Sequence, residues 1–256
     1  MVLLAGPRQC GKTTLAKELL KEFSGAYYNW DVEAHRKILR QSRMEESAKL
    51  WVFDELHKFK GWRNWLKGQF DLHRNEHAIL VTGSAKLDLY NRGGDSLQGR
   101  YFFQRLHPFT LSELLDCRVL DSASDIPKLP IRPPSAAGRN LADLTALGGF
   151  PEPLFSGSAR KAARWRMGYA TRLIREEIRS IEVARDLDRL ELLYERLPLT
   201  VGSVLSINSL REDLEAAFET IAKAISTLEV VYGVFRIPPY GPPRIKAVKK
   251  EQKLYL

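Results

Sequence analysis

Near its start the chain reads Val2-Leu3-Leu4-Ala5-Gly6-Pro7-Arg8-Gln9-Cys10-Gly11-Lys12-Thr13-Thr14. Residues 6–13 match the pattern G-x-x-x-x-G-K-[ST] in full, between an apolar run and a segment with helical periodicity. The glycines let the backbone wrap so that its N–H groups face phosphate oxygens, and a helix that begins at Lys12 adds the positive end of its dipole. The pattern therefore predicts a phosphate-binding loop; a glycine-rich turn that only caps a helix is the alternative.

The side chains of this loop have separate expected roles. The Lys12 ammonium group would reach the β- and γ-phosphates of a nucleoside triphosphate, and the Thr13 hydroxyl would be a ligand of Mg²⁺. The candidate nucleotide-binding residues are Gly6, Pro7, Arg8, Gln9, Cys10, Gly11, Lys12, Thr13 and Thr14.

The first 115 residues alternate short apolar runs with helical patterns, which is typical of a parallel sheet flanked by helices. An α/β fold of the P-loop NTPase type is therefore expected. The predicted strands are 2–5, 27–30, 50–53, 78–81 and 101–103, and the predicted helices are 12–23 and the amphipathic stretch from Trp62 to His73.

Two acids follow the apolar strand at 50–53, and the carboxyl edge of a parallel sheet is where such residues meet a phosphate loop. Asp54 would hold Mg²⁺ through water, and Glu55 would polarise a water molecule for in-line attack on the γ-phosphate. The alternative is that both acids cap the next helix. After the fourth strand, Ser84 or Thr82 would hydrogen-bond the γ-phosphate or the attacking water; ordinary loop chemistry is the alternative there.

The composition changes after the sheet. Four prolines between Asp121 and Gly138 predict a linker between a P-loop domain at 1–120 and a helical domain at 139–256. Two extended segments, 230–236 and 253–256, surround a proline-rich turn, and with three short helices before them they fit a winged helix. The predicted helices of this half are 139–147, 158–184, 187–197, 208–214 and 216–229.

With these motifs in place, the chain resembles the AAA-type (AAA+ superfamily) ATPases of prokaryotes that carry a C-terminal domain of unknown function with a winged helix. The matching stretches are Gly6–Leu15, Trp51–Trp62, Leu80–Ser84, Ser96–Arg100, Leu106–Glu113, Gly148–Glu152 and Lys253–Tyr255.

The resemblance implies binding and hydrolysis of ATP with Mg²⁺ and a sheet of AAA+ type. It also implies that Arg100 acts as an arginine finger on the γ-phosphate of a neighbouring subunit, which would require a homo-oligomer. A surface arginine beside a strand is the alternative. Members of this family usually begin before the first strand and continue past the Lys253–Tyr255 segment, so we expect the chain to be a fragment or a shortened reading frame.

The composition is that of a globular protein and not of a disordered or membrane-spanning one. Of 256 residues, 44% are hydrophobic and 28% charged, which are globular values and exclude a disordered chain. No window reaches the roughly 18 apolar residues of a membrane span, and two cysteines make no disulfide framework, so a cytoplasmic protein is expected. The five histidines show no spacing typical of a metal site.

A net charge of +9 favours polyanionic partners. One such partner is DNA, with the helix at 216–229 as the recognition helix and the basic tail as the wing. The apolar residues of that helix have core-like spacing, however, which favours a winged helix used for packing or protein contacts. Three hypotheses stay open at this point. The first is an ATPase whose cycle moves a winged-helix domain. The others are a nucleotide-gated DNA-binding regulator with little or no hydrolysis, and an inactive truncated ATPase.

Overall fold

The computed structural model describes residues 1–84, 87, 97–116, 137–178, 187–239 and 252–256. The chain divides into two compact units, one built from 1–83 and 96–167 and the other from 84–95 and 168–256. Most of the predicted linker, 121–138, lies outside the described residues. The domain boundaries drawn from the sequence remain a prediction.

A five-stranded sheet forms the centre of the first unit, and every pair of neighbouring strands is parallel. Its order is β2-β3-β4-β1-β5, which confirms the α/β fold expected from the sequence. The second and fifth strands begin and end at other residues than predicted, because pairing with a neighbour, not apolar character, fixes their limits. The strands are β1 (Val2–Ala5), β2 (Gly25–Asn29), β3 (Leu50–Asp54), β4 (Ala78–Thr82) and β5 (Phe102–Arg105).

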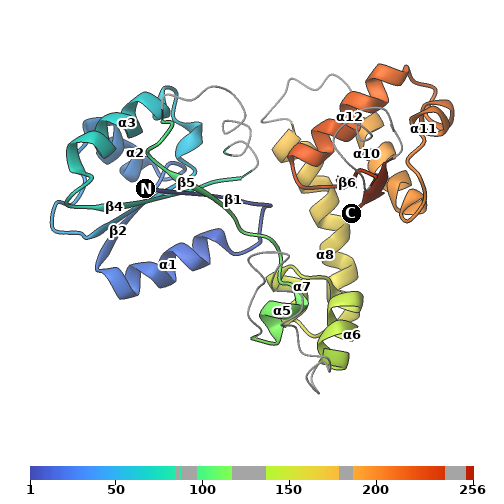
Figure 1. Ribbon diagram of the computed structural model, residues 1–256, viewed down its shortest axis with the longest axis horizontal. Coiled ribbons are helices and arrows are strands. Elements are labelled where there is room, and N and C mark those ends of the chain that lie inside the picture. The colour runs from blue at the N-terminus through green and yellow to red at the C-terminus, as the bar shows by residue number, and fades with distance from the viewer. Residues whose placement is uncertain (85–86, 88–96, 117–136, 179–186, 240–251) are drawn as a thin grey trace. The chain divides into compact units, whose positions relative to one another are not determined.

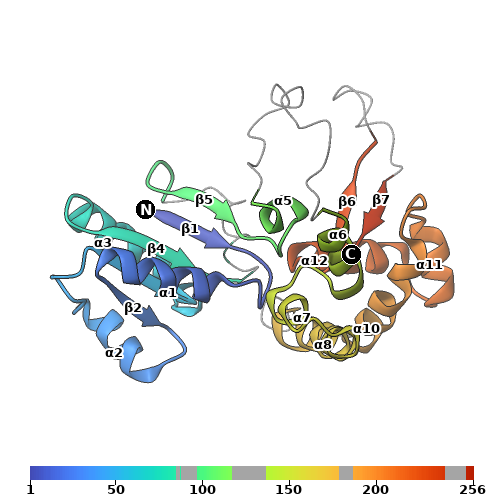
Figure 2. The ribbon, with the colours of Figure 1, turned by 90° about the horizontal axis from the view of Figure 1, so that it is seen from below.

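Helix α1 (Lys12–Phe23) covers one face of the sheet, and α2 (Glu33–Gln41) and α3 (Trp62–His73) cover the other, as Figures 1 and 2 show. Successive residues of a strand point to opposite faces. Val52 packs with Ala16 on the α1 side, whereas Phe53 meets Trp65 edge to face on the other side. Strand β3 is buried along its whole length because both faces are covered.

Helix α2 is an element that the sequence pattern does not predict. Leu39 is its one fully buried residue, and Val32 precedes it without a capping side chain. Because its apolar stripe is so short, the stability of the helix depends on the packing of Leu39 more than on the helix propensity of its sequence.

Further helices complete the first unit. Leu147, Leu154 and Ala162 form a second small core, against which Phe109 and Leu114 pack. Of these helices, the ones at residues 56–58, 111–114 and 151–155 are not expected from the sequence. They are the 3₁₀ turn η1 (Leu56–Lys58), α5 (Leu111–Leu114), α6 (Ala137–Leu147), α7 (Pro151–Phe155) and α8 (Ala159–Arg172), which reaches into the second unit.

The described residues of the second unit are mainly helical and contain the antiparallel pair β6–β7. The extended segment expected from residue 230 is wrong for 230–234, because α12 continues to Val230 and a turn follows. Val231 and Val234 are buried there, so tertiary packing decides their conformation. The elements are the π-helix η3 (Leu173–Ile178), α10 (Leu187–Arg196), η4 (Leu197–Thr200), α11 (Ile207–Asp213), α12 (Phe218–Val230), β6 (Phe235–Ile237) and β7 (Lys253–Tyr255).

Across the described ranges, the helices are too short or too polar to cross a membrane.

Substitutions in α3 test how the sheet is covered. Leu66 is fully buried and Leu72 is 74% exposed in the same helix. We expect Leu66→Ala to lower the free energy of unfolding by about 2–5 kcal/mol, because it leaves a cavity against the sheet. Leu72→Ala is the matched control and should change it by less than about 0.5 kcal/mol.

Urea unfolding followed by tryptophan fluorescence measures this difference, because all five tryptophans lie in the first unit. Equal losses for the two variants would show that α3 does not pack on the sheet in this way.

Candidate nucleotide-binding site

The loop between β1 and α1 approaches its neighbours too closely for side chains at some positions. A Cβ on Gly6 would lie 2.2 Å from the carbonyl oxygen of Leu106, and Gly11 has a φ of 105°. Gln9 also adopts a positive φ of 63°, which is uncommon outside glycine. The residues that the pattern fixes as glycine are thus those where the backbone must turn or come close to Leu106, the residue after β5.

Helix α1 begins directly after this loop, at Lys12. The amide of Leu15 donates to the carbonyl of Gly11 (2.9 Å), which is the first turn of the helix. Gly11 has no side chain to cap the amides of that turn. The helix N-terminus therefore offers N–H groups and a positive dipole end to an anion.

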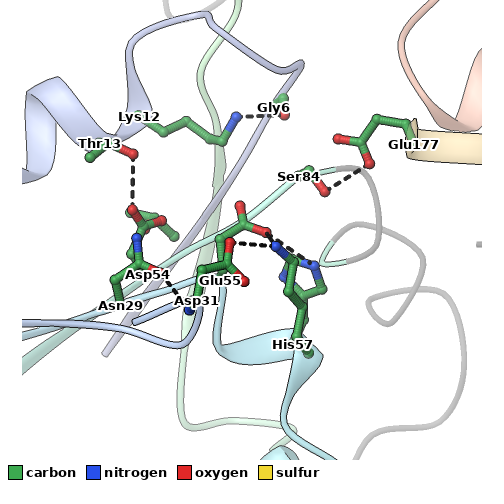
Figure 3. Close-up of polar contacts among 12 residues, drawn as sticks. Gly6, Lys12, Thr13, Asn29, Asp31, Asp54, Glu55, His57, Ser84 and Glu177 are labelled. Carbon is green, nitrogen blue, oxygen red and sulfur yellow. Dashed lines mark hydrogen bonds and ion pairs between the residues drawn. The ribbon is translucent and has the colours of Figure 1, made fainter. Parts of the chain in front are cut away.

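Lys12 is 7% exposed and lies along the inside of the loop. Its Nζ donates to the carbonyl oxygens of Gly6 (3.0 Å) and Pro7 (2.6 Å), as Figure 3 shows for Gly6. Cys10 is buried beside it, and burial raises the pKa of the Cys10 thiol against the opposing effect of the Lys12 charge. Lys12 Nζ also contacts the Cys10 sulfur at 3.8 Å, and a buried cation whose described partners in the loop are two carbonyls and a thiol is well suited to an anionic ligand. Arg8, Gln9 and Thr14 lie nearer the surface of the loop.

The carboxylate of Asp54 is hydrogen-bonded to side chains from three elements. It is 3% exposed, and it accepts hydrogen bonds from the hydroxyls of Thr13 on α1 (2.9 Å), Tyr27 on β2 (2.6 Å) and Thr82 on β4 (2.5 Å). The parallel register pairs Asp54 with Thr82, which places both at the carboxyl edge of the sheet. The structure thus brings together Thr13 and Asp54, which the sequence predicts as ligands of one metal ion (Figure 3).

Tyr27 is a site residue that the sequence analysis missed. Burial and the hydrogen bond to Asp54 both raise the pKa of Tyr27, so its phenol stays protonated and donates. Asn29 donates in turn to the Tyr27 oxygen (3.3 Å). The available signal was its place two residues before the carboxyl end of β2, on the same side of the strand as Asn29.

Glu55 follows Asp54 with a φ of 56°, in the left-handed region that a non-glycine residue rarely occupies. Its amide donates to the Thr82 carbonyl (3.0 Å). Its carboxylate lies 3.1 Å from Lys58 Nζ and 3.6 Å from His57 Nε2. The strained turn sends two consecutive acids to different partners, and strain of this kind is concentrated at functional sites.

Lys58 has a second acidic partner besides Glu55. Its Nζ lies 2.6 Å from the Asp31 carboxylate. Burial alone would lower the pKa of Lys58, but the hydrogen bonds to Asp31 and Glu55 and their negative charges raise it. Lys58 therefore stays charged beside Glu55.

Two predicted site residues have partners outside the loop. Ser84 is buried in the second unit, where its hydroxyl donates to the Glu177 carboxylate on the π-helix η3 (3.2 Å). Arg100 donates two hydrogen bonds to Asp71 on α3, at 2.8 and 3.2 Å. The structure therefore pairs Ser84 with Glu177 and Arg100 with Asp71, and the roles predicted for both residues remain predictions.

The donor set fits the groups expected here. A threonine hydroxyl and a carboxylate are the hard oxygen ligands that Mg²⁺ prefers. Because the Thr13 hydroxyl donates its proton to Asp54, its lone pairs remain for a cation. Lys12 and the amides at the start of α1 fit a triphosphate.

The hydrogen bond between Tyr27 and Asp54 can be tested by mutation. Tyr27→Phe removes one donor from a buried carboxylate, so we expect the free energy of unfolding to fall by about 1.5–3 kcal/mol. In an Asp54→Ala background the same change should cost at least about 1 kcal/mol less.

Denaturant unfolding of the four proteins of this double-mutant cycle supplies the measurement. Equal costs of Tyr27→Phe in both backgrounds would contradict the contact.

Two family models match the chain. Residues 1–115 match a family described as "AAA domain", and residues 138–256 match one described as "Domain of unknown function (DUF8612)". Uncharacterized proteins of Mycobacterium bovis (Mb2031c) and Mycobacterium tuberculosis (Rv2008c) are each 26% identical over 258 residues. Each alignment takes in 100% of this chain and 54% of the relative, so the chain spans about half the length of these curated relatives.

A solved structure titled "Structure of Drosophila ORC bound to DNA" contains a chain with 14% identity and a TM-score of 0.37. The match covers 98% of this chain and 85% of that one. All five strands of the parallel sheet lie within residues 1–115, the part of the chain that matches the AAA domain. This chain therefore combines an N-terminal AAA-type domain with a C-terminal domain of unknown function.

Proposed function

We propose that this chain binds ATP with Mg²⁺ and hydrolyses it, and that the cycle changes the conformation of its C-terminal domain. The observation that carries the proposal is the 2.9 Å hydrogen bond between Thr13 and Asp54, beside a loop that holds the buried Lys12. These groups come from α1, β3 and the loop after β1. A turn that merely capped a helix would need neither the buried lysine nor the carboxylate.

In this proposal Lys12 exchanges its bonds to the Gly6 and Pro7 carbonyls for phosphate oxygens. The amides of the loop and of the first turn of α1 would bind the remaining phosphate oxygens. Thr13 would hold Mg²⁺ directly and Asp54 would hold it through water. When bound, the ion supplies positive charge that offsets the charge on the phosphates.

Glu55 is the proposed general base. It follows Asp54 directly, and its carboxylate is not engaged with the proposed metal ligand Thr13, whereas that of Asp54 is. Lys58 and His57 lie beside the Glu55 carboxylate and would fix its orientation. The attacking water would give a proton to Glu55 as it adds to the γ-phosphorus and the bond to the β-phosphate oxygen breaks.

Ser84 and Arg100 complete the proposed catalytic set. The Ser84 hydroxyl would contact the γ-phosphate or the attacking water, and it would then give up its bond to Glu177. Arg100 would act on the nucleotide of a neighbouring subunit in a homo-oligomer, and this requires release from Asp71. Thr82 is less suited to the sensor role, because its hydroxyl already donates to Asp54.

A winged helix is the proposed form of the C-terminal part. Its support is the order of α10, α11 and α12 before the β6–β7 pair, together with a β-bridge from Val204 to Lys253. We propose that it serves packing or protein contacts more than DNA binding, because α12 buries Ile221, Ile225 and Leu228 and carries acids at both ends. We place the protein in the cytoplasm, where Mg-ATP is available.

Two substitutions separate nucleotide binding from turnover. Lys12→Ala should weaken ATP binding about a hundredfold, because it removes a buried cation and its charge-assisted bonds to phosphate. Glu55→Gln should leave binding within about threefold and reduce phosphate release about 10²–10⁴-fold, since an amide cannot accept the proton. Calorimetric titration with Mg-ATP and a phosphate-release assay measure the two effects.

Lys21→Ala is the matched control for Lys12, because Lys21 lies on the same helix with an exposed ion pair to Glu18. It should bind and hydrolyse ATP as the unmodified chain does. Unchanged phosphate release from Glu55→Gln would remove Glu55 from the reaction, and unchanged ATP binding by Lys12→Ala would overturn the phosphate loop itself.

A further inference from the structure

His73, Glu76 and His77 lie together at the end of α3, at the opposite edge of the sheet from Asp54. Helix α3 ends at His73, and β4 begins directly after His77, where the sheet has its amino edge. The amides of Glu76 and His77 both donate to the His73 carbonyl at 3.0 Å, so the turn holds the three residues together. The spacing of the histidines in the sequence predicts no metal site, and this turn is what brings the three side chains together.

We propose that these three side chains form a site for a first-row divalent metal ion of the Zn²⁺ type, separate from the nucleotide. Two imidazoles and one carboxylate are a donor set that suits Zn²⁺ and its neighbours, whereas Mg²⁺ prefers oxygen ligands only. Three protein ligands leave a further coordination position for water or another ligand.

The distances are close to those of a metal site. Glu76 Oε2 lies 3.5 Å from His73 Nδ1 and 3.9 Å from His77 Nε2, and all three ligand atoms lie within 4.8 Å of one another. Tetrahedral Zn²⁺ with bonds of about 2.0–2.1 Å keeps its ligand atoms about 3.3 Å apart. Small rotations of His73 and Glu76, whose side chains are 28% and 69% exposed, supply the remaining approach.

His77 is already oriented as a metal ligand. Its Nδ1 lies 2.6 Å from the Ala48 carbonyl oxygen, and because a carbonyl only accepts, Nδ1 carries the proton. That leaves the lone pair of Nε2 on the side of Glu76 in the neutral ring. A backbone carbonyl that holds the second nitrogen is the usual support of a metal-binding histidine. The ring also stacks on Trp51, with centroids 3.9 Å apart and planes at 16°, which fixes its rotation.

An ion pair between Glu76 and a protonated histidine is the competing explanation of the cluster. Metal binding needs neutral imidazoles, and an ion pair needs at least one charged imidazole. A metal site binds added Zn²⁺ through all three side chains, whereas an ion pair does not require it. A titration with Zn²⁺ therefore distinguishes the two explanations.

The experiment titrates the full 256-residue chain, freed of metal and nucleotide, with Zn²⁺ alone in competition with a chromophoric chelator. We expect one Zn²⁺ per chain and at least a tenfold loss of affinity in His73→Gln and in Glu76→Gln. His107→Gln is the control, because His107 is exposed and outside the cluster, and it should bind Zn²⁺ as before. His77 is left unchanged because it is buried against Trp51.

Thermal unfolding gives a second readout that does not depend on the chelator. Zn²⁺ should raise the melting temperature of the unmodified chain and of His107→Gln, but not of His73→Gln or Glu76→Gln. No Zn²⁺ binding by the unmodified chain would overturn the proposal. So would equal affinity in the unmodified chain and the two cluster variants. None of these outcomes depends on ATP, so the proposal stands or fails apart from the ATPase.

Discussion

The buried carboxylate of Asp54 is the constraint on which the rest of this structure depends. A charge in so little solvent is costly unless hydrogen bonds replace its hydration. Here three hydroxyls do so, from Thr13, Tyr27 and Thr82. These residues come from α1, β2 and β4, so the requirement of one acid fixes where a helix begins and how two strands align with β3. The same three hydrogen bonds therefore stabilise the sheet and position the candidate metal ligands.

Backbone strain divides the two consecutive acids. Glu55 and Gln9 both hold left-handed conformations, which cost roughly 1–3 kcal/mol each for such residues. In return, Asp54 stays with Thr13 while Glu55 reaches Lys58. A relaxed turn after β3 would not separate the two carboxylates between these partners. The strain is thus best understood as part of how the proposed metal ligand and the proposed base are kept apart.

Much of this arrangement could be predicted from the sequence, where the signal is local. The loop from Gly6 to Thr13, the strand before it and the helix after it follow from spacing and apolar runs. Tyr27 was missed because its hydroxyl meets Asp54 only through the pairing of β2 with β3, and its place near the end of a strand does not by itself indicate that partner. Helix α2 was missed because it buries little, and residues 230–234 were wrongly expected to be extended because buried valines resemble a strand. The end of α3 at His73 was predicted, but the cluster of His73, Glu76 and His77 depends on the turn after it, which helical periodicity does not describe.

We propose that Asp54 and Thr13 hold the metal ion of a bound nucleotide. The most direct measurement is the affinity for ATP with and without Mg²⁺, in the unmodified chain and in Asp54→Asn. Mg²⁺ should tighten ATP binding in the unmodified chain, and most of this gain should be lost in Asp54→Asn, with metal-free ATP binding retained. An equal gain from Mg²⁺ in both proteins would contradict this proposal.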